Sequence, residues 1–216
     1  MTDENNILKP VFDSMRKGNV RYSKGGLNPT GASCFITDEL GNEKLIGKCH
    51  RQVWYSKNKV PRSNFPDDKT FIKFAVGHAM EENFQTHWNR MGLLIDGNIP
   101  LREDISNGDP RGELIISGEA DGLLREFEVD EEGVITNISS THAIGMEMKT
   151  NRGYFARKEV YGIGNKKYPR GHPKMDHVMQ TAMYLRMRWK LEEYYGVIID
   201  SFRIVYCQVD DALILV

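Results

Sequence analysis

The fold of this chain is decided by two stretches, GEADGLL (118–124) and AIGMEMKT (143–150). Both are apolar runs of the kind that form buried strands, and both are interrupted by charge: Asp121 in the first, Glu147 and Lys149 in the second. Side chains two positions apart on a strand share a face, so Glu147 and Lys149 point the same way. If the two strands are neighbours, an aspartate, a glutamate and a lysine converge.

This set of side chains predicts a phosphodiester-cleaving site. Two carboxylates suit Mg²⁺ or Mn²⁺, and a lysine beside them orients a water or stabilises charge developing on a phosphate. Taken alone, a Glu-x-Lys is expected by chance in a chain with 27% charged residues, and Asp121 with Gly122 fits an ordinary turn. Charges inside apolar runs need compensation, however, which favours a catalytic role for Asp121, Glu147 and Lys149.

A third element follows in the segment 172–196, whose apolar residues recur at helical spacing. Gly196 is a typical helix terminator, so one amphipathic helix is predicted to end there. Gln180 and Tyr184 lie four residues apart and therefore share one face of this helix.

Two further patterns lie nearer the N-terminus. The sequence VGHAMEENF places Gly77 and His78 on a predicted helix, and CHRQVWYSKN supplies Cys49 and Arg51 followed by aromatic residues. An Asp strand, a Glu-x-Lys strand and a Gln-x-x-x-Tyr helix follow in that order. With these motifs, the chain from about residue 49 to residue 208 resembles the RecB-like branch of the PD-(D/E)XK nuclease superfamily, which includes CRISPR-associated and phage recombination exonucleases.

The resemblance implies a fold and an activity. The fold is α/β (α+β mixed), with a restriction-endonuclease-like core, a central mixed sheet flanked by helices, and a helical N-terminal extension. Residues 1–216 would form a single nuclease domain in which 1–33 are loosely structured. The activity would be metal-dependent hydrolysis of DNA, single-stranded or at duplex ends, with an exonuclease favoured over an endonuclease.

The resemblance also implies residue roles. The metal ligands would be His78, Asp121 and Glu147, and Lys149 would be the catalytic lysine. The Met148 carbonyl and Glu119 are additional candidate ligands, although an exposed Glu119 is an equal expectation. Gln180 and Tyr184 would lie beside the active site and the DNA strand. Without the family context, a lone histidine on a helix face is a structural hydrogen bonder. With it, the imidazole favours Mn²⁺ over Mg²⁺.

The cysteines bear on a second cofactor. Branch members that hold an iron–sulfur cluster use four cysteines, whereas this chain has three, Cys34, Cys49 and Cys207. Scattered cysteines are typical of small buried residues in a reducing compartment. We therefore expect no iron–sulfur cluster.

Charge is distributed unevenly along the chain. The net charge is −1 and the pI is near 6.6, yet residues 148–190 carry a net charge of +9. Such a zone suits a phosphate backbone, and its interleaved tyrosines favour single-strand contact, although a solvated charged face is the alternative. The predicted DNA-binding residues in this zone are Arg152, Arg157, Lys158, Lys166, Lys167 and Arg170.

The remaining pattern gives a coarse map of elements. Helices are expected near 8–17, 49–57 and 71–91, the last capped by Asp67 or Asp68, with a hairpin around Gly41–Asn42. Strands are expected near 93–101, 112–118, 121–129, 143–150, 201–208 and 211–216. The stretch 151–172 reads as a mobile substrate-gripping loop.

Two other functional classes stay open: a catalytically silent nucleic-acid-binding subunit with a nuclease-like fold, and a metal enzyme acting on a small phosphorylated substrate. No apolar stretch approaches the roughly 18 residues that would span a bilayer, and the N-terminus does not resemble a signal peptide. We therefore expect a cytoplasmic location in a prokaryotic or phage-infected cell.

Overall fold

The centre of the protein is a mixed five-stranded sheet. The computed structural model describes residues 28–31, 33–37, 40–58, 60, 67–107, 115–162, 171–209 and 213–215, and the single positions 10 and 14. The strand order is β3-β4-β5-β6-β7, in which only the β5–β6 pair is parallel. The strands are β3 (Leu94–Asp104), β4 (Ile115–Val129), β5 (Ile135–Asn151), β6 (Ile198–Gln208) and β7 (Leu213–Leu215).

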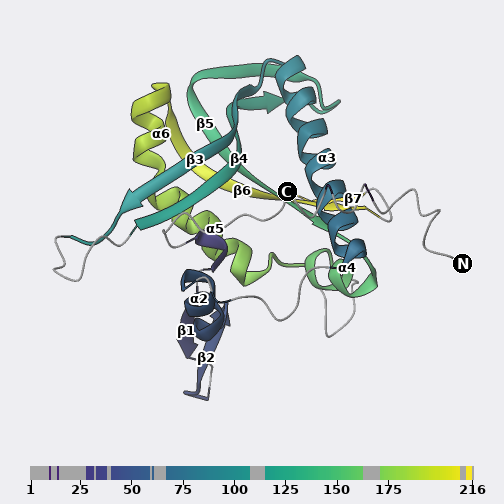
Figure 1. Ribbon diagram of the computed structural model, residues 1–216. Coiled ribbons are helices and arrows are strands. Elements are labelled where there is room, and N and C mark those ends of the chain that lie inside the picture. Colours follow the sequence, from purple (N-terminus) through teal and green to yellow (C-terminus); the bar gives the residue numbers. More distant parts are fainter. Residues whose placement is uncertain are drawn as a thin grey trace, which may run out of the picture.

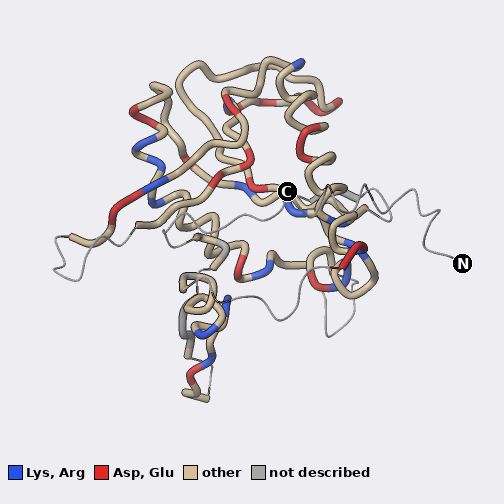
Figure 2. Tube along the Cα trace, viewed as in Figure 1, with Lys and Arg blue, Asp and Glu red and all other residues tan. Residues whose placement is uncertain are grey.

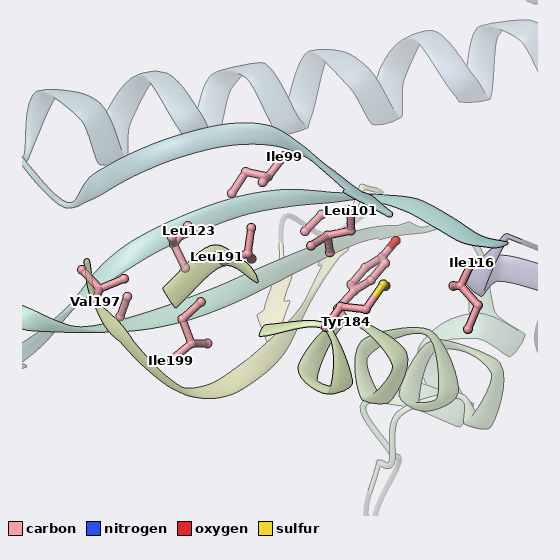
Figure 3. Packing of buried hydrophobic residues seen from close by; sticks show 11 residues of the cluster. Ile99, Leu101, Ile116, Leu123, Tyr184, Leu191, Val197 and Ile199 are labelled. Atoms are coloured by element: carbon pink, nitrogen blue, oxygen red, sulfur yellow. The ribbon is translucent and has the colours of Figure 1, made fainter. Parts of the chain in front are cut away.

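Helices cover both faces of this sheet (Figure 1). On one face lies α3 (Asp68–Arg90), whose Phe84 and Trp88 pack against a buried cluster that includes Met146 and Met148 of β5. On the other face lie α5 (Met175–Arg186) and α6 (Arg188–Tyr195). Their buried side chains form the larger core with the sheet, and Figure 3 shows Tyr184 reaching from α5 into it. The expected mixed α/β architecture is therefore present.

Two strand boundaries differ from expectation. The strands expected at 112–118 and 121–129 are a single strand, β4, so Asp121 and Gly122 do not form a turn. Likewise β5 begins at Ile135, well before the expected residue 143, after a tight turn in which Asp130 Oδ1 accepts the Val134 N–H at 2.7 Å. A glycine inside a strand reads as a turn in sequence, but here β3 pairs with β4 across it and supports the extended backbone.

The helix expected over 172–196 is two helices. The break falls at Met187, whose φ of −85° and ψ of 1° lie in the bridge region between helix and strand. A single residue in this conformation hardly changes the spacing of the apolar residues, so the helical pattern in the sequence continues across Met187. Met187 is fully buried in the larger core. The expected end of the helical segment is confirmed, since Gly196 adopts a left-handed conformation with φ of 66°.

Several local expectations nearer the N-terminus are met. The hairpin is present as β1 (Ser33–Thr37) and β2 (Glu43–Gly47), followed by α2 (His50–Lys57). Within the described residues, the part of the chain before α3 thus contains a hairpin and a helix, while most of residues 1–27 lie outside the described residues. Asp67 caps α3 by accepting the Thr70 N–H at 2.8 Å. The helix expected near 8–17 lies outside the described residues, apart from two positions.

A short 3₁₀ helix, η2 (Pro29–Gly31), precedes the β1–β2 hairpin in the chain and packs against β4 and α5. Gly118 of β4 leaves room for it, because a Cβ there would lie 2.9 Å from both the Pro29 ring and the Tyr184 ring. Within the stretch 151–172, expected to be a loop, residues 154–160 form the helix α4 (Tyr154–Val160), and residues 163–170 lie outside the described residues. Among the described helices, none has the length and apolar character needed to cross a membrane.

Candidate active site

The candidate site lies where β4 and β5 separate. Among the described residues, the last β4–β5 pair is Gly122↔Met146, and beyond it β4 pairs with β3 while β5 pairs with β6. Asp121 is the first β4 residue past that pair. Its carboxylate Oδ2 accepts a hydrogen bond from the Met148 N–H at 2.5 Å. The Asp121 side chain therefore accepts a backbone N–H of β5 at the point where the two strands stop pairing, which we call the fork.

Glu147 lies across the fork from Asp121 and is almost completely buried, with 2% of its surface exposed. Its Oε1 accepts hydrogen bonds from Lys149 Nζ and, at 2.7 Å, from Gln180 Nε2. Its Oε2 is also buried and has no hydrogen-bond partner within the described part of the chain. A buried carboxylate oxygen without a partner is unfavourable, so this atom fits a cation that binds there.

The electrostatics of the fork disfavour two ionised carboxylates. Burial, followed by the nearby charge of Asp121, raises the pKa of Glu147 to about 7. Burial also raises the pKa of Asp121, although the Met148 N–H and the charge of Lys149 oppose that rise. Perturbed carboxyl groups of this kind are concentrated at functional sites, because a bound cation or a reacting group compensates for them.

Helix α3 brings a third carboxylate to the same place. Burial, and then the charges of Asp121 and Glu119, raise the pKa of Glu81 to about 7. His78 lies one turn earlier on α3, with its Nδ1 3.8 Å from Glu81 Oε2. Gln85 Nε2 donates a hydrogen bond to the Asp121 carbonyl at 2.7 Å, which ties α3 to the fork.

Glu81 was not among the predicted site residues, although a signal for it exists in the sequence. It lies three positions after His78, so the two share a helix face, whereas Glu82 is exposed. Gly77 lies on the side of α3 that faces β5, because a Cβ at that position would be in contact with Thr150 Oγ1 of β5, at 3.4 Å.

Helix α5 connects the two sides of the fork. Gln180 Nε2 donates to Glu147 Oε1 and also to Tyr184 Oη, the latter at 2.8 Å. The Tyr184 hydroxyl donates in turn to the Glu119 carbonyl of β4 at 2.9 Å. Gln180 is 4% exposed and Tyr184 is 1% exposed. The structure therefore places both predicted residues beside Glu147, inside the protein.

A histidine and a tyrosine that the sequence did not single out lie beside Lys149. Tyr206 of β6 is the register partner of Lys149, and its Oη lies 2.7 Å from His177 Nδ1 and accepts the Lys174 N–H at 3.0 Å. Burial, with the charge of Lys149 contributing, lowers the pKa of His177 to about 4. The imidazole is therefore neutral near pH 7.

The predicted DNA-binding residues are only partly described. Arg152 and Arg157 are exposed and Lys158 is half-buried, all on or just before α4, while Lys166, Lys167 and Arg170 lie outside the described residues. Figure 2 shows acidic residues in the middle of α3, and basic residues together with acidic ones in the region of α4. Part of the basic zone is neutralised locally, because Lys174 pairs with Glu159, Arg186 with Glu103 and Arg188 with Glu192, at 3.5, 3.5 and 3.6 Å.

The predicted metal ligands are near one another but not tightly grouped. Among the described residues, three donor atoms lie within 4.8 Å of one another at Glu126, His142 and Asp200. His78, Asp121 and Glu147 do not form so close a group, since Glu147 is turned towards Lys149 and Asp121 towards the Met148 N–H. In the group of three, His142 Nδ1 is already hydrogen-bonded to Asp200 Oδ2 at 2.7 Å, and all three side chains are partly or fully exposed.

Comparison with known proteins gives a fold and no activity. No family model matches the chain, and no curated protein matches its sequence. A solved structure titled "Crystal structure of SSO0001" matches 97% of this chain and 75% of its own, with a TM-score of 0.51 and 15% sequence identity. At this identity, the likeness shows that the two chains share a fold.

Proposed function

We propose that this protein is a divalent-metal-dependent DNA nuclease, and that it acts as an exonuclease in recombination, repair or phage and CRISPR DNA processing. The observation that carries the proposal is the buried Glu147 carboxylate at the β4–β5 fork. It faces Asp121, holds Lys149 and has one oxygen without a partner among the described residues. We place this activity in the cytoplasm of a prokaryotic or phage-infected cell.

The donor set fits a hard or intermediate divalent cation. Asp121 and Glu147 would hold Mg²⁺ or Mn²⁺, with Glu81 and His78 approaching from α3. The carboxylates suit either ion, and the imidazole favours Mn²⁺. When bound, such an ion lowers the pKa of a coordinated water and neutralises charge on the phosphate. Its positive charge would also allow the carboxyl groups with raised pKa values to ionise together.

The protein's own groups would supply orientation and a positive charge. Lys149 is held against Glu147, where its ammonium can orient a water or stabilise charge developing on a phosphate oxygen. Gln180 and Tyr184 would act as positioning residues, since they contact Glu147 and the β4 backbone from inside the protein. Arg152 and Arg157 lie exposed beyond the end of β5, where the DNA backbone would continue.

Digestion of end-labelled DNA tests the proposal directly. The wild-type protein is incubated with linear and circular, single- and double-stranded DNA in the presence of Mg²⁺, Mn²⁺ or EDTA. We expect cleavage of linear DNA with either ion and none with EDTA, while Glu147→Gln abolishes it. Resistance of circular DNA would identify an exonuclease. Cleavage that persists in Glu147→Gln would show that a contaminating nuclease or another site is responsible.

One observation favours a catalytically silent DNA-binding subunit as the second candidate. Glu147 is paired with Lys149, and the three predicted ligands are not as tightly grouped as Glu126, His142 and Asp200. A single-turnover digestion with excess protein and Mn²⁺ separates the two candidates, because a silent subunit would bind the oligonucleotide and leave it intact.

A further inference from the structure

Two aromatic rings are exposed side by side at the start of α4. Tyr154 is 60% exposed and Phe155 is 81% exposed. Their ring centroids are 5.7 Å apart and the ring planes are inclined at 72°. Single exposed apolar residues are common, but an adjacent aromatic pair presents flat surface area on which a planar partner can stack.

The surroundings of this aromatic pair are positively charged. Lys158 Nζ lies 5.7 Å from the centroid of the Tyr154 ring, a cation–π contact, and Arg152 and Arg157 are exposed on either side of the pair in sequence. The acidic residue of α4, Glu159, is compensated by Lys174 at 3.5 Å. Aromatic rings among cations are what single-stranded nucleic acid requires, because its bases stack while its phosphates are neutralised.

The aromatic pair is close to the candidate active site along the chain. Tyr154 follows Lys149 by five residues, so their Cα atoms are at most about 18 Å apart. β5 leads directly from the fork to the start of α4, through a turn at Gly153 with φ of 84° (Figure 1). A DNA strand whose phosphate lies at Lys149 can therefore continue over α4 within a short stretch.

We propose that Tyr154 and Phe155 form a base-stacking surface that holds unpaired nucleotides next to the scissile phosphate, so that the substrate is single-stranded DNA or a frayed end. The inference rests on the proposed nuclease function. In a duplex the bases already stack on one another and hide their faces, so the rings of α4 contribute to binding only where the strand is unpaired. Contacts of Arg152, Arg157 and Lys158 with phosphates alone would bind single-stranded and double-stranded DNA similarly.

A binding experiment with matched variants tests the stacking surface. In a Glu147→Gln background, which prevents cleavage, the affinities for a single-stranded oligonucleotide and for the same sequence as a blunt duplex are measured. The variants are Phe155→Ala, Phe155→Trp and, as the control, Tyr194→Ala, which removes a ring that is 80% exposed on α6. A single-stranded oligonucleotide with abasic positions is also tested, because it lacks the bases that would stack on the aromatic rings.

We expect Phe155→Ala to weaken single-strand binding by about fivefold to a hundredfold, since each base stacked on an aromatic ring contributes about 1–3 kcal/mol. Duplex binding and the salt dependence should stay unchanged, because no phosphate contact is lost. Phe155→Trp should retain binding, and Tyr194→Ala should not differ from the parent. The parent protein should bind abasic single-stranded DNA more weakly than intact single-stranded DNA. Phe155→Ala should reduce the affinity for abasic DNA only slightly further, because the stacked base is already absent.

Three outcomes would overturn the inference: an unchanged single-strand affinity in Phe155→Ala, an equal loss on single-stranded and duplex DNA, or a change in sedimentation showing that the ring mediates self-association. Failure of the proposed function is a separate result, because it appears as absence of metal-dependent cleavage by the wild-type protein on every DNA form. A selective loss of single-strand binding in Phe155→Ala would support the stacking surface even then.

Discussion

Gln180 of α5 donates a hydrogen bond to Glu147 Oε1 at 2.7 Å, and this contact sets the position of the buried carboxylate. The same amide donates to Tyr184, whose hydroxyl reaches the Glu119 carbonyl on the other strand of the fork. The helix therefore holds together two strands that no longer pair with each other. If Glu147 is a metal ligand, Gln180 is a residue that orients a ligand, and Tyr184 orients Gln180.

The first prediction concerns this hydrogen-bonded chain. Gln180→Leu keeps the side-chain volume but removes the bond to Glu147, and we expect kcat to fall by about tenfold to a hundredfold. Tyr184→Phe removes only the hydroxyl and should cause a smaller fall in kcat. Steady-state cleavage rates check both variants, with melting temperatures as a control for folding. Wild-type rates in Gln180→Leu would show that Glu147 needs no support from α5.

The second prediction separates catalysis from stability at the fork. Glu147→Gln and Lys149→Ala should each abolish cleavage. Their stabilities should change in opposite directions at pH 8 without metal. Glu147→Gln removes a buried charge and should raise the melting temperature, whereas Lys149→Ala leaves Glu147 without its ion pair and should lower it. Calorimetry gives the melting temperatures, and cleavage by either variant within about tenfold of wild type would refute the assigned site.

The third prediction tests Glu81, which the structure adds to the site. Glu81→Gln should weaken Mn²⁺ binding and slow cleavage, because the carboxyl group lies near Asp121 and its pKa is raised to about 7. Glu82→Gln is the matched control, since it makes the same change at the next residue of α3, which is exposed. Isothermal titration of metal into both variants provides the measurement. Equal effects of the two substitutions would mean that Glu81 acts only through the overall charge.

The fourth prediction is a pH dependence of stability. Glu81 and Glu147 have pKa values raised from 4.5 to about 7 in the folded protein. Protonated carboxyl groups are therefore favoured in the fold, so the stability they contribute is complete below pH 4.5 and is lost as pH rises through about 7. A divalent ion binds the ionised forms, so stabilisation by Mn²⁺ should grow from pH 6 to pH 8.

Thermal melting across this pH range, with and without Mn²⁺, checks the fourth prediction. In the double variant Glu81→Gln/Glu147→Gln, the stabilisation by Mn²⁺ should grow much less between pH 6 and pH 8 than in the wild-type protein. A stabilisation by Mn²⁺ that is independent of pH between 6 and 8 would contradict the assignment of these two carboxyl groups to the metal site.

The fifth prediction concerns where a metal binds. Crystals soaked in Mn²⁺ should show anomalous density that contacts at least two of His78, Asp121 and Glu147. Asp121→Asn should weaken binding more than His78→Ala, because the carboxylate contributes charge as well as a donor atom. Density only at Glu126, His142 and Asp200 would instead mean that the ion binds at a different part of the sheet from the fork.

Much of the site is encoded locally in the sequence. The two-residue period of a strand puts Glu147 and Lys149 on one face, and the structure joins them by a hydrogen bond. The cap at Asp67 and the left-handed Gly196 follow from residues within one helical turn. Such features depend on near neighbours in the chain, which is why residue type and spacing are enough to predict them.

The fork itself depends on tertiary structure. Whether β4 runs through Asp121–Gly122 or turns there is decided by the pairing of β3 with β4, which comes from residues far away in the chain. The same is true of the position of Glu81 near Asp121, which depends on the packing of α3 against the sheet. Each contact joins elements separated by tens of residues, and local periodicity carries no information about which elements become neighbours.

Residue type and spacing thus establish which charged residues interrupt the apolar strands and which side chains share a face. The packing of distant segments establishes that Glu147 is buried, with one oxygen that has no hydrogen-bond partner within the described chain, and that Gln180 orients Glu147 from inside the protein. It also establishes that α4 is a helix with exposed aromatic rings. The physical reason is that burial, and the pKa shifts it causes, are properties of the packed protein, since water is excluded only when distant segments meet.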